Sequence, residues 1–138
     1  MKVTALMSTE VVSVELDDSL KEIKSIFDEK GFHHLLVVES GKLLGIISDR
    51  DLFLSLSPKV GTNAASKSDL ATLQKRAHQI MSHDPVTLKQ DSLIQEAIKL
   101  FNQEDISCIP IVDNEKRPVG ILSWRDIMRK LGELYQQS

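Results

Sequence analysis

One seven-residue phrase occurs twice in this chain of 138 residues. GIISDRD fills residues 45–51 and GILSWRD fills residues 120–126, so both read glycine, two aliphatic residues, serine, any residue, arginine, aspartate. The match extends well beyond the phrase, over residues 5–56 and 79–131, with one extra residue in the second copy near residues 114–118. A repeat of this length identifies an internal duplication, and the fold must be built from two copies of one unit.

Each copy has the pattern of one short supersecondary unit. Aliphatic and β-branched runs predict strands at residues 11–14, 35–38 and 43–47, and again at residues 86–88, 109–112 and 118–122. Apolar residues at helical spacing predict a helix after the first strand and another after the third. About 50 residues make a small core alone. We therefore predict an α/β (α+β) fold of two β-α-β-β-α repeats, packed sheet to sheet with pseudo-two-fold symmetry.

The first helix of each copy has a candidate capping box at its start. Ser19-x-x-Glu22 and Ser92-x-x-Gln95 have the required spacing, although the second is one residue out of register with the first. Both motifs place a serine just before an apolar helical pattern. They predict that the two helices begin at these serines.

A polar segment separates the two copies. Residues 57–68 predict an exposed loop, and residues 68–81 have apolar positions at the spacing of a connecting helix. The predicted divisions are therefore repeat 1 at residues 1–56, the loop and connecting helix at residues 57–78, and repeat 2 at residues 79–138.

The composition excludes several classes of partner. Lys and Arg number 17 against 20 Asp and Glu, for a net charge of −3, which disfavours nucleic acid. No apolar run approaches the roughly 20 residues of a membrane span, so no membrane partner is expected. The single cysteine excludes an intrachain disulfide and fits a reducing compartment. These features predict a cytoplasmic protein.

The end of the repeated phrase has two interpretations. Ser-x-x-Asp is the spacing of a capping box at a helix start, and capping alone accounts for Ser48, Asp51, Ser123 and Asp126. Capping does not explain the arginine before each aspartate, because a cation in the first turn opposes the helix dipole. A bound anion explains it, since free backbone amides and a guanidinium both favour phosphate. With an aspartate to accept the hydroxyls of a ribose, the phrase predicts a nucleotide site.

The phrases GIISDRDL and GILSWRDI, with SCIPIVD at residues 107–113, resemble the signatures of CBS domains, the cystathionine β-synthase repeats that pair as a Bateman module. The layout is similar to that of stand-alone bacterial CBS-pair proteins, including those of the acetoin utilisation type. The resemblance implies a regulatory protein that binds an adenine nucleotide (AMP, ADP or ATP) and changes its conformation or partner binding. Two residues depart from the family pattern: Leu36 replaces a proline, and Trp124 replaces a small or polar residue.

The resemblance also implies two ligand clefts, each built from both repeats. One cleft takes Ser123, Arg125 and Asp126 from the second repeat with Val12, Ser13, His33 and His34 from the first. The other takes Ser48, Arg50 and Asp51 with Val86, Thr87, Ser107 and Cys108. In the family's chemistry the aspartate binds ribose, serine and arginine bind phosphate, and aliphatic side chains surround adenine. Packing explains His33 and His34 equally well before their family position is considered.

Other functions compete with the nucleotide sensor. The alternatives are an S-adenosylmethionine sensor and a ligand-independent dimerisation or protein-interaction module with vestigial clefts. We expect no enzyme, no catalytic residue and no catalytic cofactor, because no activated nucleophile or acid–base pair is evident. No C-x-x-C or H-x3-H spacing occurs, so no metal is expected. The family pairs through its helices, which implies a homodimer, with an unidentified protein partner also possible. Its expected interface residues are Ile127, Leu131, Leu134, Leu52 and Leu56.

Overall fold

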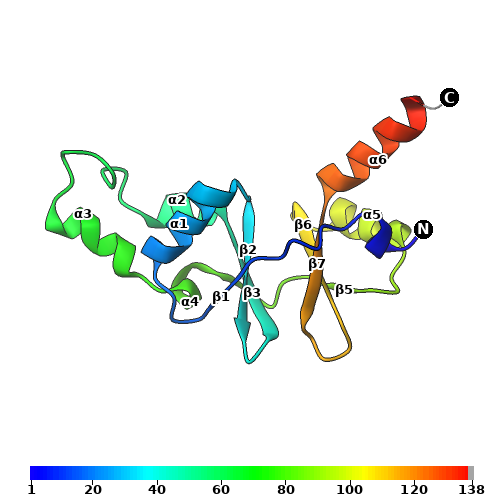
Figure 1. Ribbon diagram of the computed structural model, residues 1–138, viewed down its shortest axis with the longest axis horizontal. Coiled ribbons are helices and arrows are strands. Elements are labelled where there is room, and N and C mark those ends of the chain that lie inside the picture. The colour runs from blue at the N-terminus through cyan, green and yellow to red at the C-terminus, as the bar shows by residue number, and fades with distance from the viewer. Residues whose placement is uncertain (137–138) are drawn as a thin grey trace. The chain divides into compact units, whose positions relative to one another are not determined.

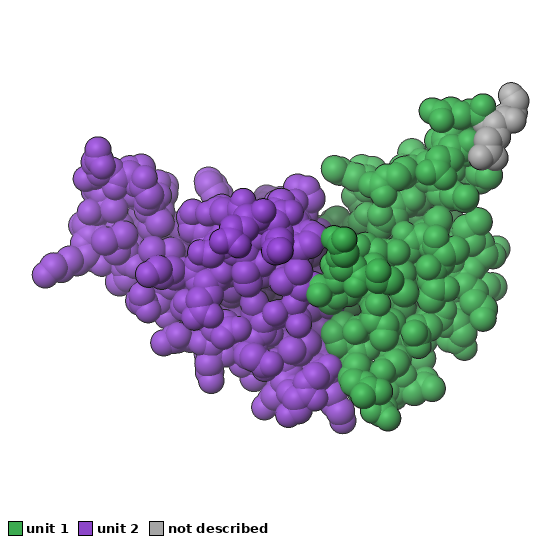
Figure 2. All heavy atoms as spheres, in the orientation of Figure 1, with its two compact units in different colours: residues 1–11, 85–138 green, residues 12–84 purple. Residues whose placement is uncertain are grey.

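The computed structural model describes residues 1–136, which fall into two compact units (Figure 1). Unit 2 comprises Val12–Asp84, and unit 1 comprises Met1–Val11 and the chain from Pro85 onward, as Figure 2 shows in purple and green. Each unit holds the strands and helices of one repeat. The segment that leads into the first repeat, however, packs within the unit of the second.

Unit 2 is built on a four-stranded sheet in the order β1-β2-β3-β4. β1 runs parallel to β2, and the other neighbours are antiparallel. Its elements are β1 (Ser13–Glu15), α1 (Leu20–Lys30), β2 (His34–Glu39), β3 (Lys42–Ser48), α2 (Asp49–Ser55), α3 (Lys67–Ala71), the 3-10 helix η2 (Thr72–Gln74), α4 (Ala77–Ile80) and β4 (Ser82–His83).

Unit 1 repeats this plan with a three-stranded sheet in the order β5-β6-β7. Its elements are the 3-10 helix η1 (Val3–Ala5), β5 (Leu88–Lys89), α5 (Ile94–Gln103), β6 (Cys108–Val112), β7 (Pro118–Ser123) and α6 (Trp124–Gln136). Ser8 forms an antiparallel bridge with Ile121 of β7, as Ser82 of β4 pairs with Ile46 of β3. The predicted α/β class and the order of strands and helices in each repeat are confirmed.

Burial explains the long apolar runs of the sequence. Residues 35–38 of β2 and all of β6 are buried, as expected for strands covered on both faces. Each unit has its own apolar cluster, in which the sheet packs against the helix that follows its first strand. Ile23 and Phe27 of α1 serve this role in unit 2, and Ile94 and Ala97 of α5 serve it in unit 1. The helices therefore hold the sheet ends, where the candidate residues lie, in fixed positions.

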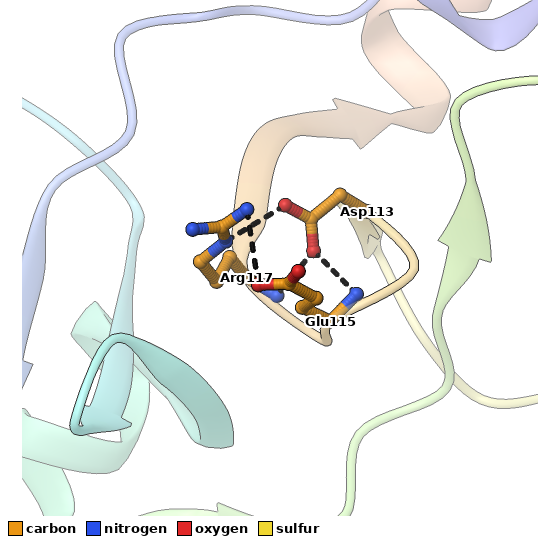
Figure 3. A network of polar contacts seen from close by, with 3 residues as sticks. All are labelled: Asp113, Glu115 and Arg117. Atoms are coloured by element: carbon orange, nitrogen blue, oxygen red, sulfur yellow. Dashed lines mark hydrogen bonds and ion pairs between the residues drawn. The ribbon is translucent and has the colours of Figure 1, made fainter.

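The extra residue of the second copy lies in the turn of its hairpin. In unit 2, Ser40 and Gly41 connect β2 and β3 with φ angles of 51° and 78°, the two left-handed residues of a tight two-residue turn. In unit 1, the longer turn is organised by Asp113 (Figure 3). Its carboxylate accepts from the backbone N–H of Glu115 at 2.8 Å and from Nε of Arg117 at 2.9 Å. The carboxylate also accepts a bond from the backbone N–H of Arg117. Together these bonds lower the pKa of Asp113, and the bond from the Arg117 backbone contributes most.

Two local expectations are wrong. The helix α5 has Leu93 as its N-cap, with the Glu96 carboxylate accepting from the Leu93 N–H at 2.7 Å, while Ser92 Oγ accepts from the Lys89 N–H. The Ser92 capping box therefore does not form. The expected connecting helix is broken into α3, η2 and α4. Within residues 1–136, no helix is long and apolar enough to cross a membrane.

Candidate functional site

The candidate residues of the first repeat lie at one end of the unit 2 sheet. β1 and β2 begin there, and β3 ends there, because β1 is parallel to β2 and β3 is antiparallel to it. The Val12 carbonyl accepts from the Leu36 N–H at 3.0 Å, and His34 is the register partner of Ser48. This sheet end gathers Val12, Ser13, His33, His34, Ser48, Arg50 and Asp51.

Unit 1 brings its own candidates together in the same way. Cys108 is the register partner of Ser123 where β6 begins and β7 ends, and the Trp124 N–H donates to the Ser107 carbonyl at 3.3 Å. The corresponding bond in unit 2 joins the Asp49 N–H to the His33 carbonyl at 2.9 Å. This sheet end gathers Val86, Thr87, Ser107, Cys108, Ser123, Arg125 and Asp126.

Both aspartates form capping boxes. Asp51 Oδ2 accepts from the Ser48 N–H at 2.9 Å, and Ser48 Oγ accepts from the Asp51 N–H at 3.0 Å. At the start of α6 the same two bonds join Ser123 and Asp126 at 2.8 and 3.2 Å. The capping interpretation of these four residues is confirmed. Because capping uses Oδ2 of each carboxylate, Oδ1 is not needed for it.

A third capping box shows what capping alone requires. Ser66 and Asp69 at the start of α3 make the same two reciprocal bonds, of 2.8 and 3.2 Å, and their motif is Ser-Lys-Ser-Asp with no arginine. The bond that the Asp69 carboxylate accepts from the Ser66 backbone N–H, followed by those from the Ser57 and Ser66 hydroxyls, lowers the pKa of Asp69 to about 2. A helix start in this chain is therefore capped fully without the arginine that precedes Asp51 and Asp126.

The two arginines lie at the surface and make few contacts with their own units. Both side chains are exposed, and Arg50 makes no hydrogen bond or ion pair with any described residue. Arg125 lies over the Trp124 ring, with its guanidinium carbon 5.8 Å from the ring centroid, a distance at which a cation–π contact is still favourable. Trp124 is itself 48% exposed. Each helix start thus presents one cation to solvent beside a capping carboxylate.

The histidines before β2 differ from each other. His33 Nδ1 lies 2.8 Å from Asp49 Oδ2, and both side chains are mostly exposed, so this pair holds the first residue of α2 to the strand end. His34 is half-buried, and burial lowers its pKa, with His33 acting in the same sense and Asp49 and Asp51 opposing it. At neutral pH, His34 therefore acts as an uncharged hydrogen-bonding group.

Cys108 is a buried thiol. Burial raises its pKa to about 12, with the nearby charge of Asp126 adding to the effect. A thiol in this state is a weak nucleophile, because the thiolate is the reactive form. No group of three or more His, Cys, Asp or Glu side chains within residues 1–136 is arranged to hold a metal ion.

A hollow beside Asp126 includes residues that the sequence analysis did not single out. It has a volume of about 200 Å³ and is lined by Ala5, Leu6, Asp126, Arg129, Lys130 and Glu133. The N-terminal segment reaches this place because it packs within unit 1. Alignment of the two repeats indicates the extra positive charge of this hollow, because the first repeat has Leu54-Ser55 where the second has Arg129-Lys130.

Each predicted cleft combines residues from both compact units. In one cleft, Asp126 belongs to unit 1 and His33 to unit 2. In the other, Asp51 belongs to unit 2 and Ser107 to unit 1. The structure brings together the residues that each unit contributes. The two composite clefts themselves remain a prediction.

The fold and the paired helix starts define a tandem pair of small β-α-β-β-α domains. The family model for the CBS domain matches the chain twice, over residues 3–57 and 77–133. The chain therefore belongs to the CBS domain family and contains two copies of the domain.

Two curated relatives show how far the similarity extends. A CBS domain-containing protein of Dictyostelium discoideum is 32% identical over 128 residues, which cover 91% of this chain and 88% of the relative. An uncharacterized protein of Methanocaldococcus jannaschii is 30% identical over 129 residues, 94% of this chain but 43% of the relative. The chain thus spans most of one relative and less than half of the other.

Three solved structures share the fold. The CBS domain pair of protein MJ0100, in complex with 5′-methylthioadenosine and S-adenosylmethionine, has a TM-score of 0.76 at 28% identity and covers 96% of this chain and 97% of that one. The cytosolic domain of the Mg²⁺ channel MgtE with ATP has a TM-score of 0.74 at 25% identity, over 93% of this chain and 48% of that one. An acetoin utilization protein (AcuB) from Vibrio cholerae has a TM-score of 0.78 at 22% identity, over 100% of this chain and 97% of that one. The predicted resemblance is confirmed.

Proposed function

We propose that this protein is a regulatory sensor that binds AMP, ADP or ATP at the starts of α2 and α6 and responds by changing its conformation or partner binding. The observation that carries the proposal is the pair of exposed arginines, Arg50 and Arg125. Each precedes a carboxylate that caps its helix, and the cap at Ser66–Asp69 forms without an arginine. Because both copies have an arginine at the same position and a guanidinium binds phosphate oxygens in pairs, a bound phosphate explains the two arginines best.

The division of labour within each site follows from the capping geometry. Capping uses Oδ2 of Asp51 and Asp126, so Oδ1 accepts the ribose hydroxyls. The neighbouring arginine and the free N–H groups of the first turn bind the phosphate. Residues from both units complete the two clefts, as predicted above. The ATP complex of the MgtE domain supports this chemistry by analogy.

An S-adenosylmethionine sensor is the second candidate, because the MJ0100 domain pair was solved with that ligand and with 5′-methylthioadenosine. The two candidates differ at one place. A nucleotide brings phosphate to Arg50 and Arg125, whereas S-adenosylmethionine brings a sulfonium and an amino-acid group. The arginines favour the nucleotide, since its phosphates are anionic whereas S-adenosylmethionine has a net positive charge despite its one carboxylate.

The test is titration calorimetry and thermal unfolding with AMP, ADP, ATP, adenosine and S-adenosylmethionine. At a hundredfold excess over its dissociation constant, a ligand that binds only the folded protein adds about 2.7 kcal/mol of stability. We expect the nucleotides to raise Tm by several degrees and adenosine to raise it less. Asp51→Asn and Asp126→Asn remove the charge while an amide oxygen can still accept the capping bond. Each should weaken nucleotide binding about tenfold or more.

Asp69→Asn is the matched control, because it alters the same capping geometry on α3, a helix start to which no nucleotide is assigned. It should leave nucleotide affinity unchanged. Preferential binding of S-adenosylmethionine would favour the second candidate. If no adenine compound binds, the chain is a ligand-independent interaction module.

We also propose that the protein forms a homodimer through α6. Trp124, Met128 and Leu131 are 48%, 55% and 40% exposed, and their spacing of four and three residues is that of a heptad seam. Ile127 and Leu52, expected at this interface from the sequence, are buried in the two apolar clusters and belong to the cores. A seam of this kind fits a second copy of the same helix.

Light scattering tests the dimer. Met128→Glu with Leu131→Glu places two like charges on the seam and should convert a dimer to a monomer at micromolar concentration. Ile98→Glu on α5, a residue that is 40% exposed and is not part of the proposed seam, is the control and should stay dimeric. A wild-type monomer, with and without nucleotide, would refute this proposal.

The same proposal assigns no catalysis, no metal and no catalytic cofactor to the chain. Its function is recognition of an adenine nucleotide, and any further protein partner would read the change in conformation. The proposed location is the cytoplasm, where the free thiol of Cys108 remains reduced.

A further inference from the structure

The hollow beside Asp126 lies between the end of η1 and the part of α6 from Asp126 to Glu133. Its volume is about 200 Å³, and its wall carries two cations and two carboxylates on one helix, with the chain at Ala5 and Leu6 opposite. All of these residues lie within unit 1. The hollow therefore adjoins the carboxylate that the proposed nucleotide site uses for ribose.

The two cations are held only weakly in the absence of a ligand. Arg129 Nη1 lies 3.5 Å from Asp126 Oδ1, and the Arg129 side chain is 65% exposed. Lys130 Nζ lies 3.8 Å from a Glu133 carboxylate oxygen, and both side chains are at least one-third exposed. Exposed pairs at these distances are worth little, so both cations can turn toward a stronger anion.

The first repeat has no counterpart of this charged wall. The offset that pairs Asp51 with Asp126 pairs Leu54 with Arg129 and Ser55 with Lys130. Leu54 is 71% exposed, so this position in unit 2 presents an apolar side chain to solvent. The two repeats thus have the same cap and the same preceding arginine but differ by two positive charges one turn further along.

We propose that Arg129 and Lys130 bind the terminal phosphates of a nucleoside diphosphate or triphosphate whose ribose lies at Asp126. This inference rests on the proposed function and names the ligand class of its second-repeat site. A guanidinium binds phosphate oxygens in pairs, and an ammonium adds a point charge. When Arg129 turns to the phosphate it releases Asp126 Oδ1, which then accepts a ribose hydroxyl. Recognition of the ribose and of the terminal phosphates is therefore coupled through one side chain.

Glu133 gives the proposal a second, opposite test. Its carboxylate lies on the wall of the hollow and repels a polyphosphate that has no bound metal. Removing this charge strengthens the binding of a triphosphate, whereas removing the two cations weakens it. A hollow that is only a surface irregularity shows neither effect.

The experiment is calorimetric titration with AMP, ADP, ATP and tripolyphosphate in buffer without divalent metal. All variants carry Asp51→Asn, so that the second-repeat site dominates the signal. Arg129→Leu with Lys130→Ser installs the residues of the first repeat. This variant should bind ATP about tenfold or more weakly and bind AMP at least as tightly, because Asp126 Oδ1 is no longer paired with Arg129. Glu133→Gln should bind ATP several-fold more tightly, and added salt should weaken ATP binding less in the Leu/Ser variant than in its parent.

The outcomes separate this inference from the proposed function. If AMP and ATP both bind and the Leu/Ser variant changes neither affinity, Arg129 and Lys130 do not contact phosphate and the inference is overturned. If tripolyphosphate binds as tightly as ATP and depends on the same two cations, the hollow is a polyphosphate site independent of ribose, which also overturns it. If no adenine nucleotide binds the parent, the proposed function itself fails. Leu54→Arg with Ser55→Lys, on Asp126→Asn instead of Asp51→Asn, should create an ATP preference at the first-repeat site.

Discussion

Gly45 and Gly120 begin the two repeated phrases, and a methionine sulfur lies against each of them. A Cβ added at Gly45 would lie 2.5 Å from Met81 Sδ and 2.9 Å from the Ser82 carbonyl oxygen. A Cβ added at Gly120 would also overlap the sulfur of Met7, but all its close neighbours belong to the Met7 side chain. We predict that Gly45→Ala destabilises the protein and that Gly120→Ala is nearly neutral.

The difference comes from what can move. Met7 is only half-buried, and its unbranched side chain can turn away from a new methyl group. Ser82 is fixed in β4, where it pairs with Ile46 of β3, so its carbonyl cannot retreat without breaking the ladder. Overpacking of this kind costs about 1–3 kcal/mol. Alanine in place of glycine also restricts the unfolded chain, which offsets about 0.4–1 kcal/mol of this loss of stability. The net loss is about 1–2 kcal/mol for Gly45→Ala and about zero for Gly120→Ala.

Thermal and urea unfolding measure the difference. Gly45→Ala should lower Tm by roughly 3–8 °C, and Gly120→Ala should change it by a degree or two. Hydrogen exchange should quicken around Ser82 and His83 in the first variant, because β4 is pushed from β3. Adding Met7→Ala should remove any small loss seen in Gly120→Ala, while Met81→Ala should not rescue Gly45→Ala. Equal losses of Tm in the two glycine variants would refute the reasoning.

Two further predictions follow from the pKa values of buried groups. Burial lowers the pKa of His34 below its usual 6.5 in the folded protein. As pH falls, His34 is therefore protonated in the unfolded chain before it is protonated in the folded one. The free energy of unfolding should fall as pH drops below about 6.5, until the pKa of the folded state is passed. His34→Gln should flatten this dependence in urea titrations at several pH values, and an unchanged slope would assign it to other groups. The pKa of Cys108, raised to about 12, predicts that a disulfide reagent at pH 8 labels the folded protein at least a hundredfold more slowly than the unfolded one. Similar rates in the two states would show that the thiol is accessible.

The duplication allowed most of the fold to be predicted from the sequence. Strands buried along their whole length leave continuous apolar runs, and the two copies confirm each other's order of elements. The alignment of the two copies also indicates where α5 begins. Ser19 and Glu22 align with Leu93 and Glu96, and the structure uses that register, with the glutamate capping the helix although its N-cap is a leucine. The Ser92 motif was a local match that the alignment of the repeats contradicts.

The placement of the N-terminal segment could not be predicted. Met7-Ser8 and Met81-Ser82 are the same dipeptide, and each lies near the start of its own repeat in the chain. The structure instead pairs Ser8 with β7 and Ser82 with β3, so each dipeptide joins the sheet of the repeat it does not lead into. Because both sheets present a glycine at this place, no local sequence feature distinguishes one arrangement from the other. For this reason the contribution of Ala5 and Leu6 to the hollow at Asp126 could not be predicted.

The candidate sites show why a cap and a ligand site are hard to distinguish in a sequence. A serine and an aspartate three residues apart cap α2, α3 and α6 alike. Only the exposed arginine before the aspartate separates the two helix starts that we assign to nucleotides from the one that is merely capped. In our proposal the aspartate serves both purposes, because capping uses Oδ2 and leaves Oδ1 for a ligand.

Divergence around the shared motif gives the two helix starts different charge. The start of α2 carries Asp49 beside Asp51, and Asp49 is paired with His33. The start of α6 carries Trp124 at the matching place and adds Arg129 and Lys130 one turn later. A phosphate at α2 would therefore meet an extra carboxylate, whereas one at α6 would meet two extra cations and the single carboxylate of Glu133. Since the capping groups and the proposed ribose-binding groups are the same, we expect this difference to act on the phosphate portion of the ligand, and the second repeat should favour the more highly charged nucleotides.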